Sequence, residues 1–231
     1  MLAQRYPDAY DGIAAGAPAI YWTEFFSSIQ WAQQVMSMLG KAPHECEIDA
    51  LVAAAVSECD ELDGIADGII GEIEACIYHF DPFKLVGSPI ECSDVSNVSI
   101  SNIAATVVNA TWHGMQTEDG KKTWYGIPPG ADLTGNFPTS HGQPGVVKTD
   151  CTSGTCVGVA NALGLQWLQL FVAKDPNNDL SNLTHAEFNS LVHASGQIYR
   201  STISTDDPDL SRFRDAGGKL VTFHGLVGNP P

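Results

Sequence analysis

A short acidic segment at residues 59–70, CDELDGIADGII, has the residue types of a divalent-cation site. Ca²⁺ takes about six to eight oxygen ligands from carboxylates and backbone carbonyls, so a loop that binds it must turn both kinds of oxygen inward. The glycines at 64 and 68 permit the positive φ values that such a wrap needs. The spacing is not that of an EF-hand. The predicted ligands are the carboxylates of Asp60, Asp63 and Asp67 and the main-chain carbonyls of Ile65 and Ile69.

The charge around this segment supports a bound cation. Residues 42–83 contain eleven acidic residues and no Lys or Arg. A structural Ca²⁺ would offset the repulsion among them. The alternative is a turn-rich acidic loop without metal, because solvent and salt screen exposed charges that lie more than roughly 10 Å apart, and Asp-Gly pairs are common in turns.

The composition limits the classes of partner. The 231 residues include 11 Lys and Arg against 27 Asp and Glu, for a net charge of −16. Nucleic-acid and anionic-membrane binding rely on clustered cations, so this balance argues against both kinds of partner. An apolar content of 44% is ordinary for a globular protein, of one large α/β domain or two smaller ones.

The six cysteines favour disulfide bonds over a zinc site, because their number is even and no paired CxxC spacing occurs. Cys59 and Cys76 flank the acidic loop, so a bond between them would hold it closed. Cys151 and Cys156 could close a small loop. Two cysteines then remain for each other by elimination only: Cys46 and Cys92. Six reduced thiols are the alternative.

Secretion fits this cysteine usage. Three sequons for N-glycosylation start at Asn97, Asn109 and Asn182. The residues after Met1 do not form a signal peptide. We therefore expect Met1 to be an internal methionine of a longer secreted protein.

The elements at the two ends follow an α/β order. Residues 1–10 are predicted to end a helix, and residues 11–15 form a short buried strand. Near the other end, a helix starts at Asp207-Pro208, stops at the glycine pair 217–218 and leads into a second buried strand at 219–223. Helix, stop and buried strand thus occur in the same order twice.

The region between the ends is predicted to be mostly helical, without a strong strand pair. The predicted helices cover residues 48–56, 100–112, 159–173 with a break at Gly164, and 184–195 with a capping box of Thr184 and Glu187. This predicts an α/β fold in which residues 1–20 and 206–231 are parts of a core, and residues 21–205 are an inserted domain or lid.

Few residues outside the acidic loop suggest chemistry. The sequence has no G-x-S-x-G nucleophile elbow. His224 follows the strand at 219–223, at the end where open α/β sheets place functional groups, although a His-Gly pair there is also a common turn. Five aromatic residues could line a substrate pocket or form core: Trp22, Phe25, Phe26, Trp31 and Trp167.

Three segments together resemble the fungal tannase and feruloyl esterase family. The opening MLAQRYPDAYDGIAAGAPA is similar to the segment after the nucleophile, CDELDGIADGII to the calcium loop of the lid, and DLSRFRDAGGKLVTFHG to the strand before the catalytic acid. The resemblance implies an α/β-hydrolase core with an inserted lid and a Ser, Asp and His triad. It also implies phenolic ester substrates, the five calcium ligands above and a Cys59–Cys76 bond.

The sequence departs from the family at the catalytic positions. The nucleophile would precede Met1, Gly228 stands where the acid is expected, and the histidine would follow Pro231. We therefore expect a fragment of a secreted serine esterase of phenolic esters that is inactive alone. The alternative is a calcium-stabilised binding or interaction protein derived from the lid. The genomic sequence on either side distinguishes these, because only the first predicts a serine elbow in frame upstream.

Overall fold

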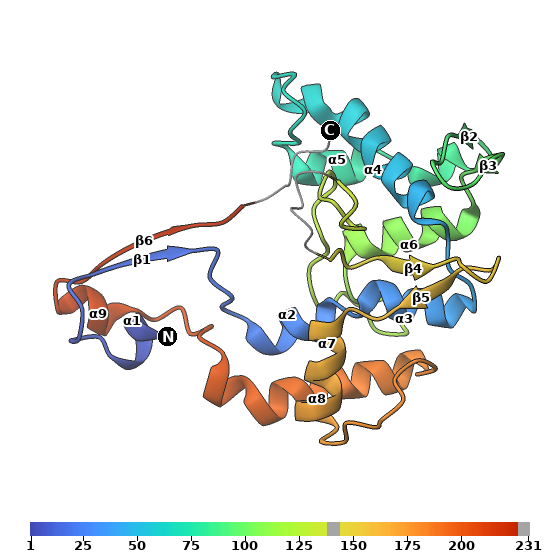
Figure 1. The fold of residues 1–231 in the computed structure, drawn as a ribbon. Helices are drawn as coiled ribbons and strands as arrows, with labels where there is room; N and C mark the ends of the chain where they lie inside the picture. The colour runs from blue at the N-terminus through green and yellow to red at the C-terminus, as the bar shows by residue number, and fades with distance from the viewer. Residues whose placement is uncertain (138–143, 226–231) are drawn as a thin grey trace.

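The computed structural model describes residues 1–137 and 144–225, which form a two-stranded arm and a larger helical body (Figure 1). The arm contains the first and last strands, β1 (Gly12–Gly16) and β6 (Lys219–Phe223). Two short helices lie at its far end, α1 (Leu2–Arg5) and α9 (Ser211–Asp215). The described residues between β1 and α9 belong to the body or to the segments that lead to it.

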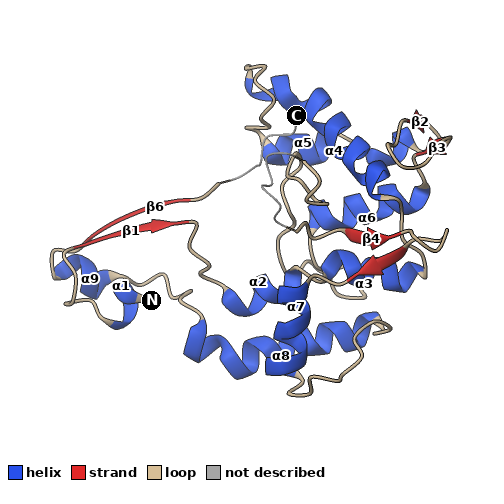
Figure 2. Ribbon diagram, viewed as in Figure 1, coloured by secondary structure: helices blue, strands red, loops and turns tan. Residues whose placement is uncertain are grey.

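The two strands predicted near the ends are neighbours. β1 and β6 pair in parallel, from Gly12 opposite Lys219 to Gly16 opposite Phe223. Parallel neighbours need a crossover connection, and here the whole helical body is that connection. Their carboxyl ends therefore meet at the same end of the arm, beside the body (Figure 2).

The prediction that both strands are buried is wrong. All five residues of β6 are exposed, and the side chains of Val221 and Phe223 are 66% and 70% exposed. A parallel strand is buried when helices cover both faces of its sheet. Within residues 1–137 and 144–225, β1 and β6 have only each other as strand partners, so their apolar side chains stay uncovered.

The core of the body is built by three helices. α3 (Trp31–Leu39), α4 (Glu45–Cys59) and α6 (Asn102–His113) pack together, with α2 (Trp22–Ser28) and α5 (Ile73–His79) beside them. Side chains at helical spacing on α4 and α6 are fully buried, among them Ile48, Leu51, Val52, Val107 and Val108. This confirms the helices predicted over 48–56 and 100–112. α4 extends beyond its predicted bounds at both ends, whereas α6 starts two residues later than predicted and ends one residue later. No helix in the described part of the chain is both long and apolar enough to span a membrane.

The predicted capping box is present. The Thr184 hydroxyl accepts a hydrogen bond from the Glu187 amide, and the Glu187 carboxylate accepts one from the Thr184 amide. It starts α8 (His185–Ile203), which continues well past the predicted end at 195.

The start predicted at Asp207-Pro208 is wrong, because α9 begins at Ser211 after an irregular segment in which Asp209 accepts a hydrogen bond from the Ser211 amide.

The prediction for residues 159–173 is only partly right. The helix α7 (Ala162–Gln166) begins after Asn161 and continues as a π-helical segment, η4 (Trp167–Val172). Gly164 lies inside α7 and does not break it. A Cβ at that position would lie 2.9 Å from the main-chain oxygen of Phe26, so the glycine lets α7 pack closely on α2.

Two antiparallel strand pairs were not predicted. β2 (Pro89–Ile90) pairs with β3 (Val98–Ser99), and β4 (Lys148–Asp150) pairs with β5 (Val157–Val159). Strands of two or three residues are too short to produce an alternating pattern in the sequence. The described part of the body also contains the 3₁₀ helices η1 (Asp60–Asp63) and η2 (Pro82–Leu85).

The structure confirms the disulfide interpretation and all three pairs. Cys59 is bonded to Cys76 on either side of the acidic loop, and Cys151 to Cys156 across the β4–β5 turn. The pair inferred by elimination, Cys46 and Cys92, joins the start of α4 to the segment after β2. Each bond closes a loop of a different length, so the three bonds are expected to stabilise the folded state by different amounts.

Candidate functional site

The acidic loop connects α4 to α5, and its two glycines have the expected backbone. Gly64 and Gly68 have φ of +89° and +78°, which residues with a side chain rarely adopt. η1 forms the first half of the loop, and the disulfide between Cys59 and Cys76 joins the helices on either side. The loop is therefore closed at its base by a covalent bond and turned twice by glycine.

Asp60 holds the second half of the loop against the first. Its Oδ1 accepts hydrogen bonds from the main-chain amides of Asp67, Gly68 and Ile69, at 3.2, 2.8 and 3.1 Å. Such charge-assisted bonds are stronger than bonds between neutral groups. Asp60 thus has a structural role in closing the loop.

The other two aspartates make more local bonds. Asp63 accepts from the Ile65 amide and Asp67 from the Ile69 amide, at 2.9 and 3.0 Å. Asp63 also lies across the loop against Gly71, where a Cβ would be 2.2 Å from its Oδ2. The side chains of Ile65 and Ile69 are 60% and 44% exposed.

The three carboxylates are brought into one loop, but not into a ready cluster. Among residues 1–137 and 144–225, one group of three His, Cys, Asp or Glu side chains has its ligand atoms within 4.8 Å of one another. That group is His44, Cys151 and Cys156, and it includes none of the loop aspartates. Its two sulfur atoms already form a disulfide, so they are not free to bind a metal. The five predicted calcium ligands remain a prediction, and their oxygen-only chemistry suits a hard cation.

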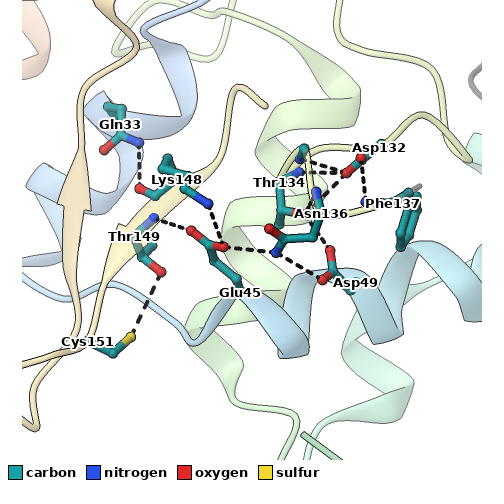
Figure 3. Close-up of polar contacts among 11 residues, drawn as sticks. Gln33, Glu45, Asp49, Asp132, Thr134, Asn136, Phe137, Lys148, Thr149 and Cys151 are labelled. Atoms are coloured by element: carbon teal, nitrogen blue, oxygen red, sulfur yellow. Dashed lines mark hydrogen bonds and ion pairs between the residues drawn. The ribbon is translucent and has the colours of Figure 1, made fainter. Parts of the chain in front are cut away.

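Part of the acidic run is neutralised by protein groups that lie far away in the sequence (Figure 3). Glu45 accepts from the Lys148 ammonium at 2.9 Å, and its other oxygen accepts from the Thr149 amide. Glu47 is buried and accepts from the amides of His44 and Ser101. Both glutamates belong to the eleven acidic residues of 42–83, a stretch that contains no Lys or Arg. The contacts that pair Glu45 with β4 cross about one hundred residues, and no local signal reveals them.

Asp49 lies in the same network, one turn after Glu45 on α4. Its carboxylate accepts from the Thr134 hydroxyl at 2.6 Å and from the Asn136 amide at 3.3 Å (Figure 3). Burial raises the pKa of Asp49, and these two hydrogen bonds oppose that rise. Asn136 also donates to Glu45, so the network ties the segment after Asp132 to α4. Its role is to hold two parts of the body together.

The five aromatic residues divide into two groups. Phe26 contacts Trp22, Phe25 and Trp167, with ring centroids 4.8, 5.2 and 5.8 Å apart. Trp31 lies elsewhere, is buried and packs on Phe188. Only Trp22 and Phe25 are exposed, at 37% and 42%. Most of the set is therefore core, with an exposed edge on α2.

His224 lies directly after β6 and is exposed, and its Nδ1 is 3.1 Å from the main-chain oxygen of Gly225. Among the described residues, no carboxylate forms a hydrogen bond or ion pair with its ring. Ser195, a buried serine of α8, donates to the Thr23 oxygen and accepts from the Trp167 indole. Among the hydrogen bonds of the described residues, none joins a serine hydroxyl to a histidine ring. Gly228, at the position expected for the acid, lies outside the described residues.

The parallel pair and the long helical connection define an α/β protein with a helical insertion, and sequence comparison gives its family. A family model described as tannase and feruloyl esterase matches residues 1–228. A probable feruloyl esterase of Arthroderma benhamiae is 34% identical over 227 residues, which cover 97% of this chain and 40% of that protein. A tannase of Aspergillus oryzae is 25% identical over 247 residues, covering 96% and 42%. This chain belongs to the tannase and feruloyl esterase family.

Solved structures agree with this assignment. Tannin acyl hydrolase from Aspergillus niger aligns with a TM-score of 0.84 and 26% identity, over 99% of this chain and 41% of that one. Feruloyl esterase B from Aspergillus oryzae aligns with a TM-score of 0.65 and 24% identity, over 97% and 41%. The resemblance stated from three sequence segments is thus confirmed. The chain spans about two-fifths of the length of these relatives.

Proposed function

We propose that this chain serves in the hydrolysis of phenolic esters, such as gallates or hydroxycinnamates, as part of a secreted serine esterase. One structural observation carries the proposal. β1 and β6 are parallel, so the segments after Gly16 and Phe223 leave the sheet at the same end, where open α/β sheets place functional groups. The ester chemistry is proposed from the names of two relatives, a probable feruloyl esterase and a tannase.

The helical body is proposed to act as the lid of that esterase. It leaves the arm after Ile20 and returns at Thr205, and the Thr205 amide donates to the Ile20 oxygen at 3.0 Å. The entry and exit of residues 21–205 are thus joined by a main-chain hydrogen bond, as expected for a domain inserted between two strands of one sheet.

In this mechanism a serine attacks the ester carbonyl, a histidine takes its proton, an aspartate orients the histidine, and backbone amides stabilise the oxyanion. We assign these roles to groups other than the described residues. Residues such as Trp22 and Phe25, exposed on α2 close to the arm, would then contact the substrate from the lid.

The purified chain alone is expected to hydrolyse neither methyl ferulate nor methyl gallate, because residual groups without a triad provide little catalysis. Product release is followed by chromatography, with the buffer and a heat-denatured sample as controls. Turnover that survives purification and disappears on treatment with phenylmethylsulfonyl fluoride would show that the chain carries its own serine nucleophile. That result would overturn the assignment of the triad to other groups.

The acidic loop is proposed to bind a structural Ca²⁺ through Asp60, Asp63 and Asp67 and the carbonyls of Ile65 and Ile69. The donors are all oxygen atoms, the two glycines give the required turns, and the disulfide limits the loop's freedom in the unfolded chain. When bound, the cation would offset the charge of the aspartates. Its role would be to fix the shape of the lid.

Calcium is expected to raise the melting temperature by several degrees. A ligand at about one hundred times its Kd adds roughly 2.7 kcal/mol to the folded state. Asp63→Asn should lose most of this rise, and Asp81→Asn should keep it. The two aspartates are matched, because each accepts a bond from the amide two residues later, Ile65 at 2.9 Å and Phe83 at 3.0 Å, and an asparagine can still accept it. Identical melting curves with calcium and with chelator, on metal-free protein, would contradict the site.

Secretion is supported by three disulfides and by two of the sequons. Asn97 and Asn182 lie exposed in loops, whereas Asn109 lies within α6. We therefore propose that glycans attach at Asn97 and Asn182.

A further inference from the structure

A histidine lies beside the disulfide that closes the β4–β5 turn. One ring nitrogen of His44 and the sulfur atoms of Cys151 and Cys156 lie within 4.8 Å of one another, and all three residues are half-buried. The two sulfurs are close because they are bonded, so the position of His44 is the informative part of this group. Cysteine sulfur and histidine nitrogen bind Zn²⁺, and zinc-binding cysteine pairs usually have about two to four residues between them. Four residues separate Cys151 from Cys156.

The hairpin also holds the two cysteines together through its main chain. The last pair of the β4–β5 ladder is Asp150 opposite Val157. Cys151 and Cys156 are the next residues on the two strands toward the turn. Across the turn, the Gly154 amide donates to the Cys151 oxygen at 3.0 Å. None of these main-chain contacts uses a sulfur atom, so we expect the two side chains to stay side by side when the disulfide is reduced.

His44 is fixed beside the hairpin by the first residues of α4. Glu45, the next residue, accepts from the Lys148 ammonium and from the Thr149 amide of β4, both at 2.9 Å (Figure 3). His44 donates from its own amide to the Glu47 carboxylate, also at 2.9 Å. The main chain at His44 is therefore held against β4 by contacts that do not depend on the disulfide.

The disulfide of the hairpin is accessible to a reductant. The turn residues 152–155 are exposed and both of its cysteines are half-buried, whereas Cys59 and Cys76 are buried in the core. Exposed disulfides are generally the labile ones. A dithiol reductant forms its own disulfide and gives two electrons and two protons to the sulfurs of Cys151 and Cys156, which become thiols.

We propose that reduction of the Cys151–Cys156 disulfide creates a Zn²⁺ site in which His44 is the third ligand. On binding, the two thiols release their protons and form two Zn–S bonds, and the neutral imidazole forms a Zn–N bond. Three protein ligands leave the fourth tetrahedral position to water. The disulfide and the metal exclude each other, so zinc binding depends on the redox state of the hairpin. The inference is independent of ester hydrolysis and of the proposed Ca²⁺ site.

Cobalt titration of the reduced chain tests the site. A phosphine reduces the folded protein by taking up the oxygen of one water, while the sulfurs receive the protons of that water, and it is then removed under nitrogen. Alkylation with mass spectrometry should find Cys151 and Cys156 reduced. Co²⁺ should then give a sulfur-to-cobalt charge-transfer band that saturates at one ion per chain and disappears when Zn²⁺ displaces it. Excess Ca²⁺ is kept present, and cobalt bound by carboxylates gives no such band.

Two outcomes of this titration would overturn the proposal. One is a hairpin disulfide that stays oxidised in the folded chain. The other is a reduced chain without the sulfur band. The oxidised chain is the first control, and the paired Cys151→Ser and Cys156→Ser variant is the second. Neither control should give the band, even where the phosphine has also opened another disulfide.

His44→Asn tests the third ligand. Asparagine is a favoured N-cap residue, so it keeps the start of α4 while it removes the imidazole. Zinc affinity, measured by competition with a chromophoric chelator, should fall at least about tenfold, because even the loss of groups that only support a ligand costs that much. His193→Asn, at an exposed histidine of α8, should leave it unchanged. Melting curves establish folding, with His44→Ser as a second N-cap variant. Unchanged affinity in a folded His44 variant would refute the assignment.

Discussion

Replacing Cys46 and Cys92 together by alanine is expected to lower the free energy of unfolding by about 4 kcal/mol, the largest loss from loop closure among the three disulfides. A disulfide stabilises chiefly by restricting the unfolded chain, and the effect grows with the loop it closes. The loops here span 46, 17 and 5 residues. The corresponding losses are about 4, 3 and 2 kcal/mol.

Urea unfolding of the three double alanine variants measures this order. The Cys151–Cys156 variant is the internal control, because its exposed turn closes only a short loop. The Cys59–Cys76 variant should exceed its loop-length value, since both cysteines are buried in the core and their replacement also leaves space. Equal losses from all three variants would show that loop length does not decide their contribution.

Gly126→Ala is expected to cost more than about 3 kcal/mol, the upper part of the usual range for overpacking. A Cβ at this position would lie 2.0 Å from the main-chain oxygen of Trp112 and 2.6 Å from that of Thr111. Both are backbone atoms at the end of α6, so neither can rotate away. The adjacent hydrogen bond from the Ile127 amide to the Thr111 oxygen, 3.0 Å, would be lost as the segments separate.

Gly196→Ala is the matched control for this prediction. Gly196 lies inside α8, its Cβ would have no atom within 4 Å, and alanine is the better helix former by roughly 1 kcal/mol. We expect this variant to be as stable as the parent or more so in the same unfolding measurement. A free energy of unfolding for Gly126→Ala within about 1 kcal/mol of the parent's, the size of a helix-propensity effect, would contradict the close approach of Gly126 to the end of α6.

Local features were readable in the sequence because their interactions span few residues. The capping box of Thr184 and Glu187 is three residues apart, and the apolar positions of α4 recur at helical spacing. The disulfide at 59 and 76 encloses the acidic loop, and that constraint is also local. The α/β class and the family resemblance likewise rested on short segments, each contiguous in the chain.

Interactions between distant segments had no such signal. Glu45 has no Lys or Arg within residues 42–83, yet Lys148 reaches it from β4. β6 was expected to be buried from its apolar residues, but burial depends on what covers a strand, which its own residues do not specify. The break expected at Gly164 does not occur. Gly164 instead allows α7 to pack closely on α2, and the residues around it in the sequence do not reveal that contact.

The sequence by itself determined the helices α4 and α6, the start of α8, the cysteine pairs, the acidic loop and the family, since spacing along one chain carries that information. The tertiary structure alone decided which acids are neutralised, how the aspartates of the loop are held, and which main-chain oxygens the buried glutamine side chains bond. The physical reason is that hydrogen bonds and burial depend on which atoms meet in space. Gln34 and Leu183, which are joined by a hydrogen bond of 2.7 Å, are separated by 149 residues.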